Sequence, residues 1–248
     1  MINMSNVERA IILAAGKGTR LKPITLTTPK PLIEVNGKRM IETIIDALVE
    51  NNIKEIYIVL GYMKEKFYYL KNKYSNIKFI ENSYYDECNN ISSLYVARDF
   101  LENCIIMDAD QIVYNKKMLF REFEYSGYCC SWEKKYTKEW VLSTDNDGIV
   151  INCSTNGGKD GWKLYSVSRW NANDGIKLKK LLVEEFINKR NRDIYWDDIA
   201  LNIYPEEFEL KVYEINEKDL LEIDSIDELS QVDLRYIKYK GDDNNEEK

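Results

Sequence analysis

The 248-residue sequence contains no histidine. This absence excludes a Ser-His-Asp triad, a Cys-His pair and a zinc site with histidine ligands. It also excludes the cytidylyltransferases that work through an H-x-G-H signature. Any chemistry in this chain must therefore rest on carboxylates, lysine and arginine, together with a hard metal ion that such groups bind.

Long apolar runs and redox motifs are also missing. No apolar stretch approaches the roughly 20 residues of a membrane helix, and the first residues, MINMSNVER, lack the apolar segment of a signal peptide. The five cysteines include no C-x-x-C pair, which is typical of reduced intracellular thiols. The net charge of −7 disfavours nucleic acid and anionic membranes as partners. We therefore expect a cytoplasmic protein.

The first half of the chain alternates between two periodicities. Apolar strand-like segments occupy residues 9–14, 55–61, 77–82 and 104–110, and amphipathic segments at 40–52, 63–74 and 90–101 separate them. Such alternation predicts βαβ units. We expect an α/β fold, with a Rossmann-like, mixed but mostly parallel sheet flanked by helices. Ligands of such sheets bind beyond the carboxyl ends of the strands.

The second half differs in composition and in its pattern of expected elements. All five tryptophans lie between residues 132 and 196, and strand-like segments occupy 128–133, 140–144, 149–153 and 162–169. Helices are expected at 174–190, 196–204 and 225–237, the last capped by Ser225, with a strand at 209–215. We interpret residues 1–239 as one domain, with a first half at about 8–125 and a small β-rich lobe at about 126–239. Residues 240–248 are expected to be a disordered tail or a linker to a further domain.

The stretch LAAGKGTRLKP at 13–23 combines a strand end, two glycines and basic residues. It lacks the four-residue spacing of a Walker phosphate loop. Six basic residues and one acid fall between residues 17 and 39 of an otherwise acidic chain. Gly16 and Gly18 allow the backbone to approach phosphates closely, while Lys17, Arg20 and Lys30 supply charge. This pattern indicates a small polyanion site, matched to a nucleoside triphosphate.

The segment LAAGKGTRLKPITLTTPKPLIEVNGK resembles the signature of nucleotidyltransferases that join a nucleoside triphosphate to a phosphorylated small molecule. Within that family the chain is similar to the bacterial CTP:phosphocholine cytidylyltransferases along most of its length. The similar segments, in order, are CNNISSLYVAR, MDADQIVY, EWVL, VSRWNA, YWDD and EIDS. The resemblance implies a magnesium-dependent transferase with a single α/β domain, which releases pyrophosphate from CTP. On this reading residues of about 8–125 are the nucleotide-binding half, and the β-rich lobe at about 126–239 is the acceptor-binding half.

The resemblance also implies roles for residues at the matching positions. It places Lys17 and Arg20 on the β- and γ-phosphates, and Lys30 near the α-phosphate and the attacking phosphate. The base and ribose are expected to contact the backbone of residues 13–16 and the side chains near Asn89, Asn90 and Ser93; the nucleotide-binding set is Leu13, Ala14, Ala15, Gly16, Gly18, Asn89, Asn90 and Ser93.

Two aspartates are candidate Mg²⁺ ligands. Asp110 follows the fourth expected strand, and Asp224 follows another strand end far along the chain. Carboxylates that converge from distant segments suit Mg²⁺, a hard cation that also takes phosphate oxygens, and the resemblance assigns both to the ion that bridges the triphosphate. Asp108 and Glu222 stand two residues before them and are expected to support them.

The acceptor is expected to carry an amine. The resemblance favours Trp140, Tyr195 and Trp196 as an aromatic cage for a quaternary ammonium, with Asp197 adding negative charge. However, Arg169 and Asn171 stand where the phosphocholine enzymes tend to carry an aromatic residue and an acid, and such a loss would weaken cation binding.

Other functions stay open at this stage. A related branch with the same architecture activates 2-aminoethylphosphonate, whose primary amine needs hydrogen-bond acceptors more than a cage. A sugar-1-phosphate nucleotidyltransferase and a catalytically silent nucleotide sensor or scaffold are further alternatives. A homodimer, or fusion to a further domain, is compatible with the sequence.

Overall fold

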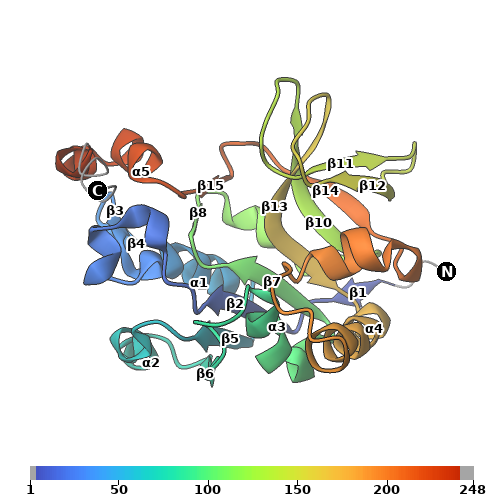
Figure 1. Cartoon of the computed structure of the whole chain (residues 1–248), viewed down its shortest axis with the longest axis horizontal. Helices are drawn as coiled ribbons and strands as arrows, with labels where there is room; N and C mark the ends of the chain where they lie inside the picture. The colour runs from blue at the N-terminus through green and yellow to red at the C-terminus, as the bar shows by residue number, and fades with distance from the viewer. Residues whose placement is uncertain (1–3, 241–248) are drawn as a thin grey trace.

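The computed structural model describes residues 4–240, and a mixed nine-stranded sheet forms the centre of this part of the chain (Figure 1). One half of the sheet is parallel, with the strand order β7-β2-β5-β6. The bounds of these strands are Arg9–Ala14 for β2, Glu55–Leu60 for β5, Ile77–Glu81 for β6 and Cys104–Asp108 for β7. The four strands expected from the first half of the sequence are therefore confirmed.

The strands of the second half extend the same sheet. β13 (Gly161–Trp170) pairs with β7 in antiparallel orientation and joins the two halves. Around it lie β10 (Gly127–Glu133), β11 (Val141–Thr144), β12 (Val150–Ser154) and β14 (Lys211–Glu214). The β-rich half is thus built onto the edge of the parallel half through β13.

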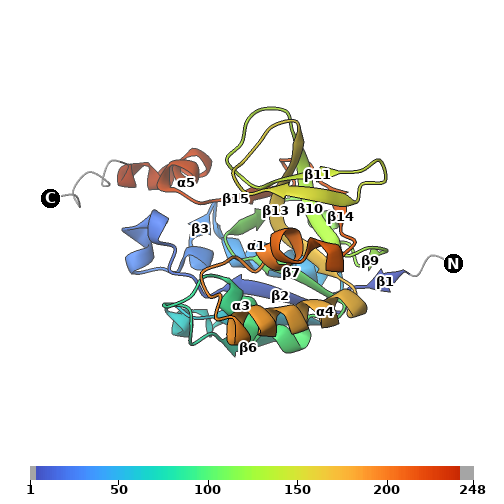
Figure 2. The ribbon, with the colours of Figure 1, turned by 45° about the vertical axis from the view of Figure 1, so that its right-hand side comes forward.

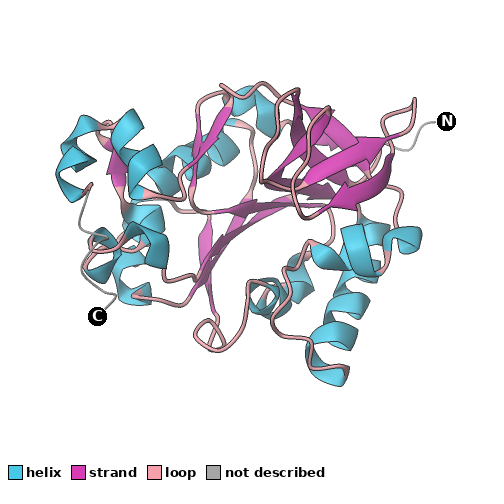
Figure 3. Cartoon of the chain, turned by 45° about the horizontal axis from the view of Figure 1, so that its top comes forward, coloured by secondary structure: helices cyan, strands magenta, loops and turns pink. Residues whose placement is uncertain are grey.

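Helices cover both faces of the sheet (Figure 3). Residues of β2 alternate between two hydrophobic clusters: Ala10 and Ile12 pack in one, and Ile11 and Leu13 in the other. The first cluster contains α1, and the second contains α3 and α4, which lie in contact with each other (Figure 2). The bounds are Met40–Glu50 for α1, Ile91–Val96 for α3 and Ala172–Val183 for α4.

A third cluster fixes the C-terminal segment against the glycine-rich loop. Leu21, Ile33 and Met40 pack there against Ile223 and Leu229. The cluster includes α5 (Ile226–Val232), and its neighbours are the short strand pairs β3–β4 (Glu34–Val35 with Lys38–Arg39) and β8–β15 (Gln111–Val113 with Leu220–Glu222). A further pair joins β1 (Ser5–Asn6) to β9 (Glu122–Phe123). This packing brings segments about 200 residues apart to one edge of the sheet.

Several expected helices are shorter than the sequence pattern indicated. Residues 63–74 form a 3₁₀ turn at Lys64–Phe67 followed by α2 (Leu70–Lys73), because Met63 has a φ of 47° and only Phe67 and Leu70 are buried. Residues 90–101 divide into α3 and a 3₁₀ turn at Arg98–Phe100, and residues 196–204 contain a π-helical turn at Ile199–Ile203. Ser225 caps α5 as expected. The tail expected to be disordered lies, apart from Lys240, outside the described residues.

Among residues 4–240, no helix has the length and apolar character needed to span a bilayer.

Candidate active site

A cavity of about 510 Å³ opens beyond the carboxyl ends of β2 and β7, as expected for ligands of a parallel sheet. It brings together most of the residues singled out from the sequence. The candidates that line it are Leu13, Ala14, Ala15, Gly16, Gly18, Arg20, Lys30, Asn89, Asn90, Ser93, Asp110, Trp140, Tyr195, Asp197 and Asp224. Lys17 and Trp196 are not among the lining residues.

The glycine-rich loop follows β2 and turns sharply at Gly18, whose φ is 61°. A side chain at this position would be strained, and its Cβ would lie 2.8 Å from the Cβ of Lys30. Gly18 therefore permits the loop to pack directly on Lys30. Gly16 has open space where a Cβ would point, so the backbone there is accessible from the cavity.

Lys30 lies between two of the predicted carboxylates. Its Nζ donates to Asp110 Oδ2 at 2.7 Å and to Asp224 Oδ1 at 2.9 Å. Burial of Lys30 by itself would lower its pKa, but the charges of Asp110 and Asp224 outweigh burial and raise it. Arg20 Nη2 donates to the same Asp224 Oδ1 at 2.7 Å. Two of the three predicted cations are thus held by the predicted metal ligands.

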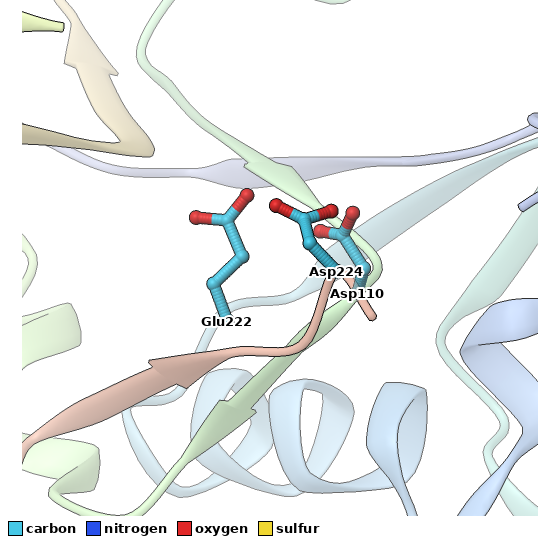
Figure 4. Close-up of side chains that lie close together, drawn as sticks. All are labelled: Asp110, Glu222 and Asp224. Carbon is cyan, nitrogen blue, oxygen red and sulfur yellow. The ribbon is translucent and has the colours of Figure 1, made fainter. Parts of the chain in front are cut away.

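Glu222 joins Asp110 and Asp224 in one acidic cluster (Figure 4). Each residue offers a carboxylate oxygen within 4.8 Å of the others. The close-up shows Glu222 at the end of β15, Asp224 just after it and Asp110 just before β8, with their side chains directed toward the same region. Burial, followed by the charge of Asp110, raises the pKa of Glu222 well above its usual value. The sequence pattern indicated only a supporting role for Glu222, although its two-residue spacing from Asp224 was a visible signal.

The acidic cluster fits a hard divalent cation. All its donors are carboxylate oxygens, which Mg²⁺ prefers, and Asp110 Oδ1 is buried without a hydrogen-bond partner among the described residues. Asp108, at the end of β7, lies beside the cluster. Burial, together with the charge of Asp110, raises the pKa of Asp108 to about 7.

Lys17 makes no ion pair with this cluster. Its ammonium pairs with Asp86, and both side chains are about half exposed. The structure therefore leaves Lys17 at the rim, and contact with a bound triphosphate would require it to leave Asp86.

The wall opposite the glycine loop is formed by α3 and the residues before it. Asn90 Oδ1 accepts a hydrogen bond from the backbone N–H of Trp196 at 2.9 Å, and Asn89 Nδ2 donates to the Asp193 carbonyl at 3.0 Å. Ser93 Oγ accepts from the buried Asn82 amide at 3.1 Å. These contacts join α3 to the loop that carries Tyr195 and Asp197.

Only part of the expected aromatic cage lies at the cavity. Trp140 and Tyr195 both line it, and their rings meet edge to face with centroids 5.8 Å apart. Trp196 is only 1% exposed and packs between Tyr128 and Trp170, so its ring, which was expected in the cage, does not line the cavity. Its neighbours come from β10 and β13, which the local sequence around Trp196 does not reveal.

The carboxyl groups near the aromatic pair include one that sequence reasoning missed. Asp197 lines the cavity, as expected, and is 4% exposed. Glu139 also lines it, and its position next to Trp140 in the sequence was the available signal. Leu164 and Ser166 of β13, Tyr85 and Cys88 also line the cavity. No sequence motif pointed to these four residues.

Arg169 and Asn171 do not bear on the cavity, which corrects the interpretation that their identity weakens cation binding. Arg169 is fully buried, donates to the carbonyls of Met118 and Phe120, and lies 4.0 Å from the centre of the Phe120 ring. Asn171 caps α4 by accepting from the N–H of Asp174. Neither residue lines the cavity.

Comparison with known proteins gives relatives over nearly the whole chain. Residues 9–125 match the family model described as nucleotidyl transferase. The chain is 36% identical to a 2-aminoethylphosphonate cytidylyltransferase of Lancefieldella rimae, with 94% of this chain and 96% of the relative covered. It is 35% identical to a choline-phosphate cytidylyltransferase of Streptococcus pneumoniae, with 91% and 96% covered.

A solved structure agrees with these relatives. The CTP:phosphocholine cytidylyltransferase of Streptococcus pneumoniae superposes with a TM-score of 0.85 at 35% identity, covering 93% of this chain and 99% of that one. The mixed α/β fold expected from the sequence is therefore confirmed. On its fold and on its similarity to relatives matched along almost their entire length, this chain belongs to the nucleotidyl transferase family.

Proposed function

We propose that this protein transfers CMP from CTP to phosphocholine, giving CDP-choline and pyrophosphate. The observation that carries the proposal is one cavity lined by two chemically different groups of residues in a chain with cytidylyltransferase relatives. The first group is the glycine loop, Arg20, Lys30 and the acidic cluster. The second group, which we call the acceptor end, is an aromatic pair with two acids, and it suits a small phosphorylated amine.

The reaction is an in-line displacement at phosphorus. A phosphate oxygen of the acceptor forms a bond to the α-phosphorus of CTP, the bond from that phosphorus to the bridging oxygen breaks, and pyrophosphate leaves with the electron pair. The acceptor phosphate is already an anion near neutral pH, so no general base is needed. A chain without histidine can therefore supply the catalysis by alignment and charge neutralisation.

The cationic residues would act on the phosphates. Lys30, which is buried beside the acidic cluster, holds the α-phosphate and the attacking phosphate together. Arg20 and Lys17 contact the β- and γ-phosphates, and Lys17 exchanges Asp86 for a phosphate oxygen as the nucleotide binds. The backbone at Gly16 and Gly18 approaches the triphosphate closely.

The remaining nucleotide contacts follow the wall of the cavity. The backbone of Leu13, Ala14 and Ala15, with Asn89, Asn90 and Ser93 opposite, would enclose the base and ribose. Asp110 and Asp224, joined by Glu222, would hold a magnesium ion. When bound, that ion supplies positive charge to the triphosphate and to the departing pyrophosphate.

The acceptor end would bind the head group. Trp140 and Tyr195 offer ring faces or edges to a quaternary ammonium, and Asp197 offers a carboxyl.

A reaction that consumes CTP also agrees with the cytoplasm as the proposed compartment. Among the described residues, all five cysteines are free thiols, which agrees with a reducing compartment.

A second acceptor is favoured by a specific observation. The relative that is 36% identical over 94% of this chain is named a 2-aminoethylphosphonate cytidylyltransferase. Glu139 and Asp197 offer carboxyl oxygens to which a primary ammonium can donate hydrogen bonds. We therefore retain 2-aminoethylphosphonate as the alternative acceptor.

Pyrophosphate release with purified protein and Mg²⁺ tests the proposal. CTP is combined with phosphocholine, 2-aminoethylphosphonate or glucose 1-phosphate, and each acceptor is repeated with ATP, GTP and dTTP. We expect CTP with phosphocholine to give the highest kcat/KM. Turnover of the phosphonate alone would make the alternative correct. Equal rates with dTTP and a sugar 1-phosphate would move the protein to the sugar branch, and no release with any pair would indicate a silent sensor or scaffold.

A further inference from the structure

The carboxyl group of Asp197 has no cation beside it in the described part of the chain. Asp197 is 4% exposed and lines the acceptor end of the cavity. Its Oδ1 is buried and has no hydrogen-bond donor among residues 4–240. No ion pair in that range includes Asp197, whereas Asp110 and Asp224 are both paired with Lys30.

The titratable groups around Asp197 are acids or weak acids. Asp108 approaches from β7, and Asp198 follows in the chain. The phenol of Tyr128 lies beside the carboxyl from β10, and a hydrogen bond from this phenol would lower the pKa of Asp197, but by less than burial and Asp108 raise it. Cys153 of β12 is also close. Arg20 and Lys30, the cations that line the cavity, are held by the acidic cluster.

A buried, unpaired carboxylate is costly, and a nearby second carboxylate increases the cost. The group avoids the cost by retaining its proton. Burial, followed by the charge of Asp108, accordingly raises the pKa of Asp197 well above its ordinary value. A raised pKa favours the neutral acid over the fixed negative charge that a cation site would be expected to present.

We propose that Asp197 carries a proton in the acceptor-free enzyme and releases it to solvent when a cationic head group enters, so that the site exchanges a proton for an organic cation. The proposal rests on the proposed function only in assuming that the acceptor carries an organic cation. The balance is simple: a neutral carboxyl and a cation become an ion pair, and one proton leaves. No other bond changes.

This exchange has a defined pH dependence. Asp197 is protonated in the free site and ionised in the complex, so cation binding is penalised at low pH. The affinity for a cationic acceptor should rise by up to tenfold per pH unit as the pH approaches the raised pKa, and become constant above it. A ligand of the same shape with an uncharged head group should show no such rise from Asp197, because it leaves the proton of Asp197 in place.

Isothermal titration calorimetry tests the exchange with the full chain. The protein is saturated with Mg²⁺ and α,β-methylene-CTP, which cannot react, and is titrated with phosphocholine or with 3,3-dimethylbutyl phosphate. The second compound replaces the ammonium nitrogen by carbon and keeps the phosphate. Titrations in PIPES and imidazole, near neutral pH, differ in apparent enthalpy by an amount proportional to the protons released.

We expect phosphocholine to release up to one proton more from the protein than the isostere, whose head group is uncharged. Because the phosphates of the ligands can also release protons, the difference between the two ligands is compared between variants. Asp197→Asn should lower this difference by up to one proton, whereas Asp193→Asn, an equal charge change at an exposed residue of the same loop, should keep it. A difference that is equal in wild type and Asp197→Asn would overturn the proposal.

A second readout requires no variant. The ratio of affinities for phosphocholine and the isostere is measured across a pH series in wild type, and it should rise with pH as described. A ratio that does not change with pH would also overturn the proposal. Failure of the proposed function is a separate outcome: an enzyme that ignores phosphocholine but accepts 2-aminoethylphosphonate would be tested in the same way with that acceptor.

Discussion

Replacing Lys30 by methionine should destabilise the ligand-free protein, and Mg²⁺ should restore most of the loss. Lys30 Nζ neutralises Asp110 and Asp224 at 2.7 and 2.9 Å. Methionine keeps much of the side-chain volume and removes the charge, so two close carboxylates are left to repel each other. A divalent cation supplies the missing charge at the same carboxylates.

The magnitude follows from burial. Breaking a fully buried ion pair costs about 3–5 kcal/mol. The lysine side chain is 10% exposed, but the two aspartates are 23% and 21% exposed, so water screens part of the lost attraction. We therefore expect a loss of about 2 kcal/mol. For a chain of 248 residues this corresponds to a decrease in Tm of about 4–8 °C.

The assay is thermal unfolding with EDTA and with excess Mg²⁺. Lys22→Met is the matched control, because Lys22 is exposed in the same segment and has no ion-pair partner among the described residues. The variant should lose stability mainly in EDTA, and Mg²⁺ should raise its Tm more than that of wild type. A Tm in EDTA equal to that of the control, or a loss that Mg²⁺ leaves unchanged, would refute the reasoning.

Three further outcomes are expected. Asp110→Asn should lower kcat at least a hundredfold, about 2.7 kcal/mol of barrier, without a change in the circular dichroism spectrum; full activity would remove its proposed role. Trp140→Leu should lower kcat/KM for phosphocholine by an amount equivalent to about 0.5–2 kcal/mol but leave CTP binding unchanged. Trp132→Leu, away from the cavity, should change neither quantity. Glu228→Ala removes a carboxylate that accepts a hydrogen bond from the N–H of Asp224 at 2.6 Å. The variant should lose about 1 kcal/mol of stability and should need a higher Mg²⁺ concentration for half-maximal activity. An unchanged Mg²⁺ requirement would mean that Glu228 acts only as a helix cap.

The positions of the central strands were predictable because their signal is local and repeated. Continuous apolar runs at 9–14 and 55–61 become β2 and β5, which are buried on both faces. The loop at the site was predictable for a similar reason, since two glycines that bracket a basic residue directly after a buried strand are typical of phosphate-binding loops. Convergence of Asp110 and Asp224 followed from their places at strand ends.

The orientation of individual side chains was harder to predict from the sequence. Trp140 and Trp196 lie in similar aromatic segments, yet Trp140 lines the cavity and Trp196 is enclosed by Tyr128 and Trp170. Lys17 lies in the signature loop but pairs with Asp86, 69 residues away. Such outcomes depend on partners that only the folded chain brings together.

The distribution of charge shows why the basic run is compatible with an acidic protein. Arg20 pairs with Asp224 across 204 residues of sequence, and Lys30 pairs with Asp110 and Asp224 across 80 and 194 residues. Arg20 and Lys30 are therefore both paired with carboxylates in the free protein. A triphosphate must compete with these carboxylates for Arg20 and Lys30, while a divalent cation must compete with the same cations for the carboxylates. Each ligand frees the partner of the other, so the two should bind most tightly together, as one exchange of ion pairs.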